Sequence, residues 1–203
     1  MTSAQQLDFS KGSIFRHILR LAGPMTLAQL INVLYNIVDR IFVGQIGGEG
    51  SLALTGLGVC FPVITIVIAF TNLIGMGGAP LFSITRGAGD DEEAARILGN
   101  SFTLLLLFGV LLTAAGLAVK TPLLRALGAS DATLPYADAY LTVYLFGSVF
   151  VSLSLGLNSF INAQGFARTG MLTVAIGAVL NLILDPLFIM VFHMGVQGAA
   201  LAT

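Results

Sequence analysis

The sequence predicts an all-α polytopic membrane protein, and two observations lead to this fold class. Hydrophobic residues make up 56% of the 203 residues, and charged residues make up only 9%, whereas a soluble domain has roughly 25% charged residues. The apolar residues also gather in long runs, each of about 20 residues or more, which is the length that a helix needs to cross a bilayer. So few charges cannot cover the surface of a water-soluble domain of this size.

The same composition excludes several other classes of protein. A disordered chain needs low hydrophobicity and high net charge, and this chain has the opposite composition with a net charge of −1. That net charge provides no basic field for nucleic acid, so we expect no nucleic-acid partner. The single cysteine, Cys60, excludes a disulfide framework and a cysteine-based metal site. The lipid bilayer remains as the expected partner.

The apolar runs predict five spans and the beginning of a sixth. They cover residues 15–43, 52–82, 95–119, 136–163 and 169–193, and the sixth begins at residue 196. Ser13 precedes the first span as an expected helix N-cap, and the loop after the third span is expected to begin at Lys120. Because a helix that stopped inside the bilayer would leave its carbonyl groups without partners, we expect residues 1–203 to be the N-terminal part of a longer protein. A short interfacial tail at residues 196–203 is the alternative.

The positive charges predict the orientation of the chain in the membrane. Of the nine Lys and Arg residues, six flank the side of the membrane on which the chain begins: Lys11, Arg16, Arg20, Arg86, Arg96 and Arg168. Cytoplasmic loops carry an excess of such residues. We therefore expect a multi-pass protein of the cell inner (plasma) membrane with a cytoplasmic N-terminus.

Two acidic residues lie well inside predicted spans, and ionisable groups in hydrocarbon are costly and usually functional. Each acid ends a polar row at helical spacing, which places each row on one helix face. The rows are Gln29, Asn32, Asn36 and Asp39 in the first span, and Thr173, Gly177, Asn181 and Asp185 in the fifth. Counted at about 1.5 Å per residue, Asp39, Asp185 and Thr203 fall at a similar depth in the outer half of the bilayer.

A proline frees a backbone carbonyl oxygen near the second acid. Pro186 follows Asp185, and because proline has no N–H, the carbonyl of Leu182 loses its helical partner. Carboxylate, amide and carbonyl oxygens within one helical turn suit Na⁺ or a proton better than a soft metal. The two acids are therefore candidates for a cation-coupling site.

Structural roles compete with this interpretation. The neighbouring Arg40 is a potential partner for Asp39, and Ser154, Asn158 and Asn162 in the fourth span are expected to link helices, as polar residues in membrane helices often do. A Gly-x-Gly-Asp string at residues 87–90 is also found in intramembrane aspartyl proteases. Here it stands beside three further acids, so we interpret it as a solvated loop that leads into a helix N-terminus.

Three segments together resemble the MATE (multidrug and toxic compound extrusion) family of transporters. They are LAGPMTLAQLINVLYNIVDRIFVGQIGGEGSLALTGLG (residues 21–58), NLILDP (181–186) and GVQGAALAT (195–203). The segment YNIVDRIFVG (residues 35–44) is most similar to the bacterial, MepA-like branch of the family. The resemblance implies a twelve-helix transporter of two lobes, of which this chain is the N-terminal six-helix lobe with its sixth helix truncated and the C-terminal lobe missing.

The resemblance also implies residue roles. Asp39, Asn181, Asp185 and Thr203 would form a cation site, for Na⁺ or for a proton, and Pro24 would mark a bend of the first helix. Pro24, Gln29, Asn32 and Asn36 are then candidates for cavity lining or gating. No catalytic residue is implied, and no cofactor is implied other than the coupling ion.

The expected function is a secondary active antiporter that exports small drug-like organic compounds, often cationic, in exchange for Na⁺ or H⁺ by alternating access. Three alternatives stay open. A lipid-linked oligosaccharide flippase of the same superfamily would need a cationic cavity, and the spans offer only Arg40. A membrane-embedded aspartyl protease would need Asp39 and Asp185 to share one water. A membrane subunit that does not transport would leave the two acids unexplained.

Overall fold

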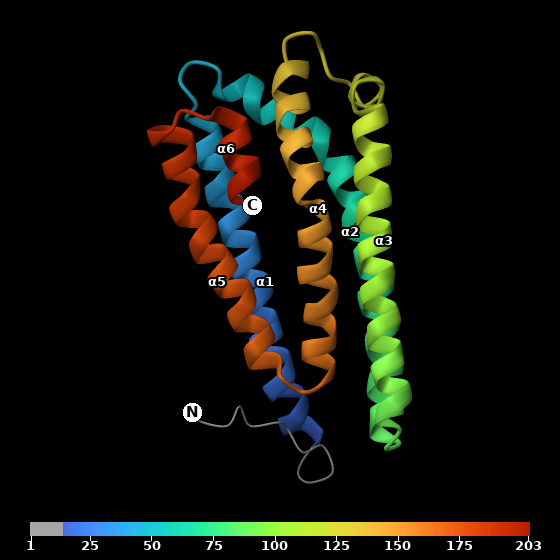
Figure 1. Ribbon diagram of the computed structural model, residues 1–203. Coiled ribbons are helices and arrows are strands. Elements are labelled where there is room, and N and C mark those ends of the chain that lie inside the picture. The colour runs from blue at the N-terminus through green and yellow to red at the C-terminus, as the bar shows by residue number, and fades with distance from the viewer. Residues whose placement is uncertain (1–13) are drawn as a thin grey trace.

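The computed structural model describes residues 14–203, and the regular elements of this part are all helices, without strands. Its elements, coloured along the chain in Figure 1, are α1 (Ile14–Gly44), α2 (Gly50–Gly87), α3 (Asp91–Ala126), α4 (Leu134–Ala163), α5 (Ala167–Pro186), the π-helix η1 (Leu187–Val191) and α6 (Gly195–Ala202). Within these residues, five helical segments are long and apolar enough to cross a membrane, the last being α5 together with η1. The all-α polytopic fold class is confirmed. The expected N-cap Ser13 lies outside the described residues.

Two connections are shorter than the charge pattern suggested. At the acidic string, α2 continues to Gly87, and the side chain of Asp90 caps α3 by accepting a hydrogen bond from the Glu93 N–H at 3.0 Å. After the third span, the expectation of a loop beginning at Lys120 is wrong, because α3 continues to Ala126. The physical reason is an ion pair: the Lys120 ammonium lies 2.6 Å from the Asp138 carboxylate of α4, so its charge is compensated within the bundle.

Proline changes the hydrogen-bond pattern at the end of α5. Pro186 cannot donate a helical hydrogen bond, and the chain continues from Leu187 as a π-helix in which the Phe192 N–H donates to the Leu187 carbonyl at 3.0 Å. Such wider turns occur frequently at functional sites. Here the π-helix directly follows Pro186, one residue after Asp185.

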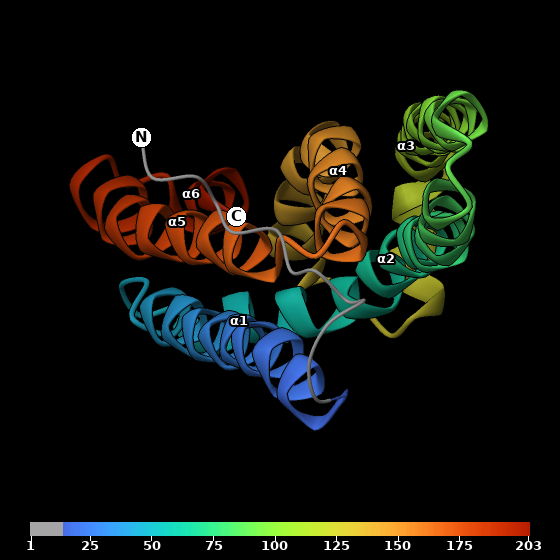
Figure 2. The same cartoon turned by 90° about the horizontal axis from the view of Figure 1, so that it is seen from below.

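The helices form two groups, which Figure 2 shows from one end of the bundle. In one group α2, α3 and α4 pack against one another, and in the other α1 lies along α5. The short helix α6 packs against α4 and joins the groups. We call the end that carries the α1–α2, α3–α4 and α5–α6 connections the upper end, as in Figure 1, and the opposite end the lower end.

The buried apolar side chains are distributed unequally along the bundle. A large cluster at the upper end joins both groups and includes Val43 of α1, Leu141 of α4 and Ala199 of α6. At the lower end the cluster consists of Ala79, Phe82, Ala94 and Phe160, all from α2, α3 and α4. The two groups of helices are therefore held together above, and an open space remains between them below.

Candidate cation site and membrane cavity

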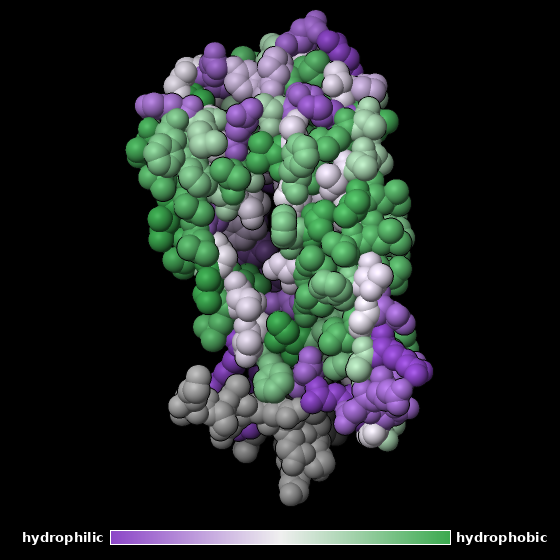
Figure 3. Space-filling model, viewed as in Figure 1, coloured by the Kyte–Doolittle hydropathy of each residue, from purple (hydrophilic) through white to green (hydrophobic). Residues whose placement is uncertain are grey.

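A cavity of about 900 Å³ occupies the space between the two groups of helices. Residues of α1, α2, α4 and α5 form its walls, and Thr203, at the end of α6, also faces it. Figure 3 shows a hollow on the face formed by α4 and α5, with hydrophilic surface inside and hydrophobic surface around it. The volume lies within the range of about 300–1,000 Å³ that is typical of small-molecule sites.

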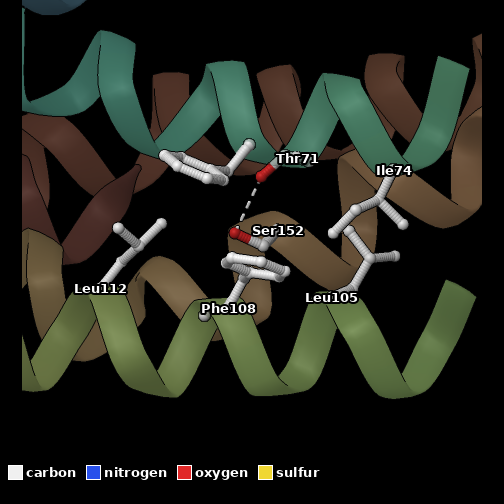
Figure 4. A pocket seen from close by; sticks show the side chains of 8 residues that line it. Thr71, Ile74, Leu105, Phe108, Leu112 and Ser152 are labelled. Carbon is white, nitrogen blue, oxygen red and sulfur yellow. Dashed lines mark hydrogen bonds between the residues drawn. The ribbon is translucent and has the colours of Figure 1, made fainter. Parts of the chain in front are cut away.

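A second gap between α2, α3 and α4 does not offer a binding site. Apolar side chains, among them Leu105, Phe108 and Leu112, surround a hydrogen bond of 2.9 Å from the Thr71 hydroxyl to the Ser152 hydroxyl (Figure 4). The gap has no room for a water molecule. It is a packing contact that joins α2 to α4.

The two acids predicted from the sequence lie side by side at the wall of the large cavity. Asp39 of α1 is 7% exposed and Asp185 of α5 is fully buried, and their carboxyl groups lie within hydrogen-bonding reach of each other. Asp39 lines the cavity, and Asp185 is not among the residues that line it. Two carboxylates in a buried site repel each other strongly, so a proton or a cation is needed to hold both there.

Asn181 completes this group from the turn of α5 that precedes Asp185. Its side-chain amide donates to the Asp185 carboxylate at 3.3 Å, and it is 3% exposed. Three buried oxygens, Asp39 Oδ1, Asn181 Oδ1 and Asp185 Oδ2, have no hydrogen-bond partner among the described residues. Buried polar atoms are normally paired, so these three hard oxygen ligands have unused capacity for a cation or a proton.

Thr203 faces the same cavity but is not part of this group. Its hydroxyl donates to the Ala199 carbonyl at 3.0 Å within α6, and it lies close to the hydroxyl of Tyr140. The structure thus brings Asp39, Asn181 and Asp185 together, and it places Thr203 on the cavity wall nearby.

The four residues expected to line or gate the cavity divide into two pairs. Asn32 and Asn36 line it, and the Asn36 amide donates to the Asn32 side-chain oxygen at 2.9 Å. Pro24 and Gln29 belong to the lower part of α1 and do not line it, and Gln29 is exposed. The polar row of the first span therefore faces the cavity only in its upper part.

Arg40 does not neutralise Asp39 by direct contact. Its guanidinium carbon lies 5.9 Å from the ring centre of Phe61 on α2, and within residues 14–203 Arg40 forms no salt bridge. The structural alternative for Asp39, in which Arg40 is its tight ion-pair partner, is not observed.

Three tyrosines of the cavity wall were not predicted from the sequence. They are Tyr35 of α1 and Tyr140 and Tyr144 of α4, and the rings of the last two lie 6.4 Å apart. The chain has four tyrosines, and three of them follow one another at a spacing of four residues, beginning with Tyr136. This spacing places the three tyrosines on one face of a helix. That pattern was the signal in the sequence from which the tyrosines of the cavity wall could have been predicted.

Asn158 of α4 links this helix to α5 at the lower end of the cavity, as predicted for it. The Asn158 amide donates to the Thr173 hydroxyl at 2.7 Å and to the Gly170 carbonyl at 3.1 Å, and the Asn162 amide donates to Asn158 Oδ1 at 2.8 Å. The two bonds of Asn158 fix α5 to α4 at this level, whereas the Asn162 bond lies within α4. Ser154 is exposed and lines the cavity.

Known proteins share both the sequence and the fold of this chain. The MatE family model matches residues 24–187. Multidrug export protein MepA of Staphylococcus haemolyticus is 30% identical over 203 residues, which are 100% of this chain and 44% of that protein.

Two solved structures superpose closely, each with a TM-score of 0.88, 32% sequence identity, and coverage of 100% of this chain and 44% of theirs. One is a multidrug resistance MATE family transporter of the MOP superfamily in an outward-facing conformation. The other is a MOP superfamily transporter from Pyrococcus furiosus, for which a reverse polarity of the binding pocket suggests a different function. This chain therefore spans less than half the length of the relatives that it matches.

Proposed function

This chain belongs to the MatE family, and on that premise we propose that it forms one lobe of a secondary active antiporter in the plasma membrane. The antiporter exports small organic compounds, often cationic, in exchange for Na⁺ or H⁺, and the N-terminus of the chain is cytoplasmic. The second lobe is supplied by the rest of the protein. A relative of similar sequence is named a multidrug export protein, which supports the class of substrate.

The observation that carries the proposal is the group of buried oxygens on Asp39, Asn181 and Asp185. Their two carboxyl groups lie together without a basic side chain in salt-bridge contact among residues 14–203. Within those residues there is also no group of three or more His, Cys, Asp or Glu side chains that could hold a metal ion. Carboxylate and amide oxygens are hard ligands, which suit Na⁺ or a proton.

The chemistry of coupling follows from charge. Two adjacent carboxylates are unfavourable in a buried site, and binding of Na⁺ or a proton relieves their repulsion. Because Asp39 belongs to α1 and Asp185 to α5, the bound ion favours the arrangement in which these helices are close. Loss of the ion favours separation or rehydration of the acids. This difference in ion affinity is what couples an ion gradient to a change of lobe conformation.

The three alternatives are less well supported. A membrane subunit that does not transport would leave the two buried acids unexplained, and the relatives are named as an export protein and a transporter. A flippase for lipid-linked oligosaccharides would require basic side chains for a pyrophosphate, and Arg40 is the one basic residue among the described residues that line the cavity. The family of the chain argues against an aspartyl protease, because the relatives are named as an export protein and a transporter.

The test is export of ethidium by the full-length transporter in proteoliposomes, with a Na⁺ gradient and a pH gradient imposed separately. We expect one of the two gradients to drive export, and Asp39→Asn and Asp185→Asn to abolish the driven component. The matched control is Asp131→Asn, because Asp131 lies on the surface, with a side chain 90% exposed, and pairs with Arg125. Driven export that survives both buried substitutions would place the coupling site in the other lobe.

A further inference from the structure

The π-helix η1 connects the acid-bearing part of α5 to an upper end that is held in place. Ile189 of η1 is 5% exposed and belongs to the large upper cluster. Gly198 of α6 lies directly against η1, because a Cβ added to this glycine would stand 2.9 Å from Phe188 Cβ and 3.0 Å from the Phe188 carbonyl carbon. Glycine is the residue that permits so close an approach of two backbones. The upper end of η1 is therefore fixed to the rest of the lobe.

The lower part of α5 is held as well. Asn158 of α4 donates to the Thr173 hydroxyl at 2.7 Å and to the Gly170 carbonyl at 3.1 Å. A Cβ added to Gly170 would stand 2.4 Å from Asn162 Oδ1, so α5 lies closely against α4 at this level. Asn181 and Asp185 lie in the stretch between these two fixed ends.

The backbone hydrogen bonds of this stretch become irregular directly above the buried acid. Pro186 has no N–H to donate. The Leu187 N–H donates to the Leu184 carbonyl, three residues back, and the Phe192 N–H donates to the Leu187 carbonyl, five residues back, at 3.0 Å. His193 then has a φ of 53°, in the left-handed region that residues other than glycine seldom adopt. The regular bonds of an α-helix, which join each N–H to the fourth residue back, are thus interrupted here, and the stretch is easier to rearrange than the rest of α5.

The wide turn of η1 determines which way the acid faces. A turn closed by a bond to the fifth residue back contains one residue more than an α-helical turn. Since one residue corresponds to about 100° of helix rotation, the place of this extra residue sets the rotation of the residues between the fixed ends. With the extra residue in η1, Asp185 and the Asn181 amide bonded to it face Asp39 of α1. If the extra residue lay below Asn181 instead, the residues above it would be turned by about 100°, and Asp185 would no longer face Asp39.

We propose that η1 is a register switch of α5, in which the extra residue moves between η1 and the part of α5 below Asn181 and so turns Asp185 toward Asp39 or away from it. The proposal rests on the proposed export function and names the movement by which ion occupancy changes the conformation of the lobe. A cation or proton held between the two acids keeps the extra residue in η1, because it binds tightly only when the carboxyl groups face each other. Release of the ion lets the extra residue pass down the helix, and the two fixed ends stay where they are.

Two single-residue deletions in the full-length transporter hold the two registers apart. Deletion of Met190 removes the extra residue above Asp185, so that α5 and η1 form one α-helix with Asp185 toward Asp39. Deletion of Leu180 removes a residue below Asn181, so that the same continuous α-helix forms with Asp185 turned away. Met190 is 40% exposed and Leu180 is 52% exposed. Because the two variants have the same length and each loses one exposed apolar residue, each is the matched control of the other.

The rotation is measured by pulsed electron paramagnetic resonance between two spin labels. They are attached to Ile183→Cys on α5 and Leu111→Cys on α3, which are 58% and 56% exposed in the native protein, in a transporter without other cysteines, Cys60 being replaced as well. A side chain ends about 5–6 Å from the helix axis, so a rotation of about 100° moves the label on α5 by about 8 Å.

We expect two distances in the transporter without a deletion. Their proportions should change between buffers that contain Na⁺ or are acidic and an alkaline buffer that contains choline. The variant without Met190 should give only the distance that Na⁺ or acid favours, and the variant without Leu180 only the other one, in every buffer. A single distance that no buffer changes in the transporter without a deletion would overturn the switch, and so would the same distance in both deletion variants.

Export provides the second readout. Gradient-driven export of ethidium should be slowed about tenfold or more in both deletion variants, a barrier increase of about 1.4 kcal/mol, because neither variant can change its register. Export at the native rate after deletion of Met190 would also overturn the switch. If a deletion variant does not fold, the distances in the transporter without a deletion decide alone. If that transporter exports ethidium on neither gradient while its two distances still respond to the ions, the proposed function fails and the switch stands.

Discussion

Lys120 and Asp138 form an ion pair between α3 and α4, with Nζ 2.6 Å from Oδ2 and also 2.5 Å from the Thr142 hydroxyl. Asp138 is thus an acid within a membrane span that has its own cation. Asp39 and Asp185 are different, because no Lys, Arg or His nitrogen of the described residues lies within salt-bridge distance of either. The contrast separates an acid that has a cationic partner within the bundle from two acids that have none, as the proposed coupling site requires.

Replacement of the fully buried acid should therefore leave the fold intact or strengthen it. Asp185→Asn keeps the shape of the side chain and removes a buried charge that has no basic partner among the described residues. The substitution is expected to be neutral or to stabilise by about 1 kcal/mol or more. Thermal unfolding of the purified full-length protein measures this, beside the loss of driven export. A clear drop in the melting temperature would indicate that the carboxylate makes a stabilising contact in the native state.

If Na⁺ is the coupling ion, it should stabilise the protein through the same residues. A ligand that binds only the folded state at about ten times its Kd adds about 1.4 kcal/mol of stability. We expect Na⁺, compared with equal choline, to raise the melting temperature of the unmodified protein but not of Asp39→Asn or Asp185→Asn. A Na⁺ effect that persists in both variants would exclude this pair as the binding site. No Na⁺ effect in the unmodified protein would favour proton coupling.

The Lys120–Asp138 pair should be structural. Lys120→Met leaves Asp138 without its cation, and because the side chains are 22% and 34% exposed, we expect a loss of about 1–2 kcal/mol, below the cost for a fully buried pair. The double variant Lys120→Met/Asp138→Leu should recover most of it, since neither charge remains. Unfolding measurements on the three proteins decide the matter. A double variant no more stable than the single one would contradict this account.

The link between α4 and α5 should contribute modestly to stability. Asn158→Leu removes the hydrogen bonds to Thr173 and Gly170, and such bonds between membrane helices are worth about 0.6 kcal/mol on average and up to about 1.7. We expect a loss in this range from thermal unfolding. Asn100→Leu is the matched control, since Asn100 is exposed on α3. Equal effects of the two substitutions would mean that the α4–α5 bonds contribute nothing measurable.

The sequence predicted the helical spans well because a run of apolar residues specifies a membrane helix without reference to its neighbours. It also placed Asn32, Asn36 and Asp39 on one face of α1, and Asn181 and Asp185 on one face of α5, because helical periodicity is a local property. Side-chain pairing across helices is not local. For that reason the sequence did not predict that α3 continues past Lys120 to Ala126. The charge of Lys120 is compensated by Asp138 of α4, which only the packing of the helices reveals.

The sequence alone was enough to predict the membrane class, the approximate spans and the two acids inside them. The rotation of the helices and their packing against one another could be seen only in the folded structure, as could the absence of a salt bridge between Arg40 and Asp39. That packing brings Asp39 next to Asp185, excludes Pro24 and Gln29 from the cavity, and adds Tyr35, Tyr140 and Tyr144 to its wall. The physical reason is that a helix fixes which residues share a face, whereas the contacts between helices decide what each face meets.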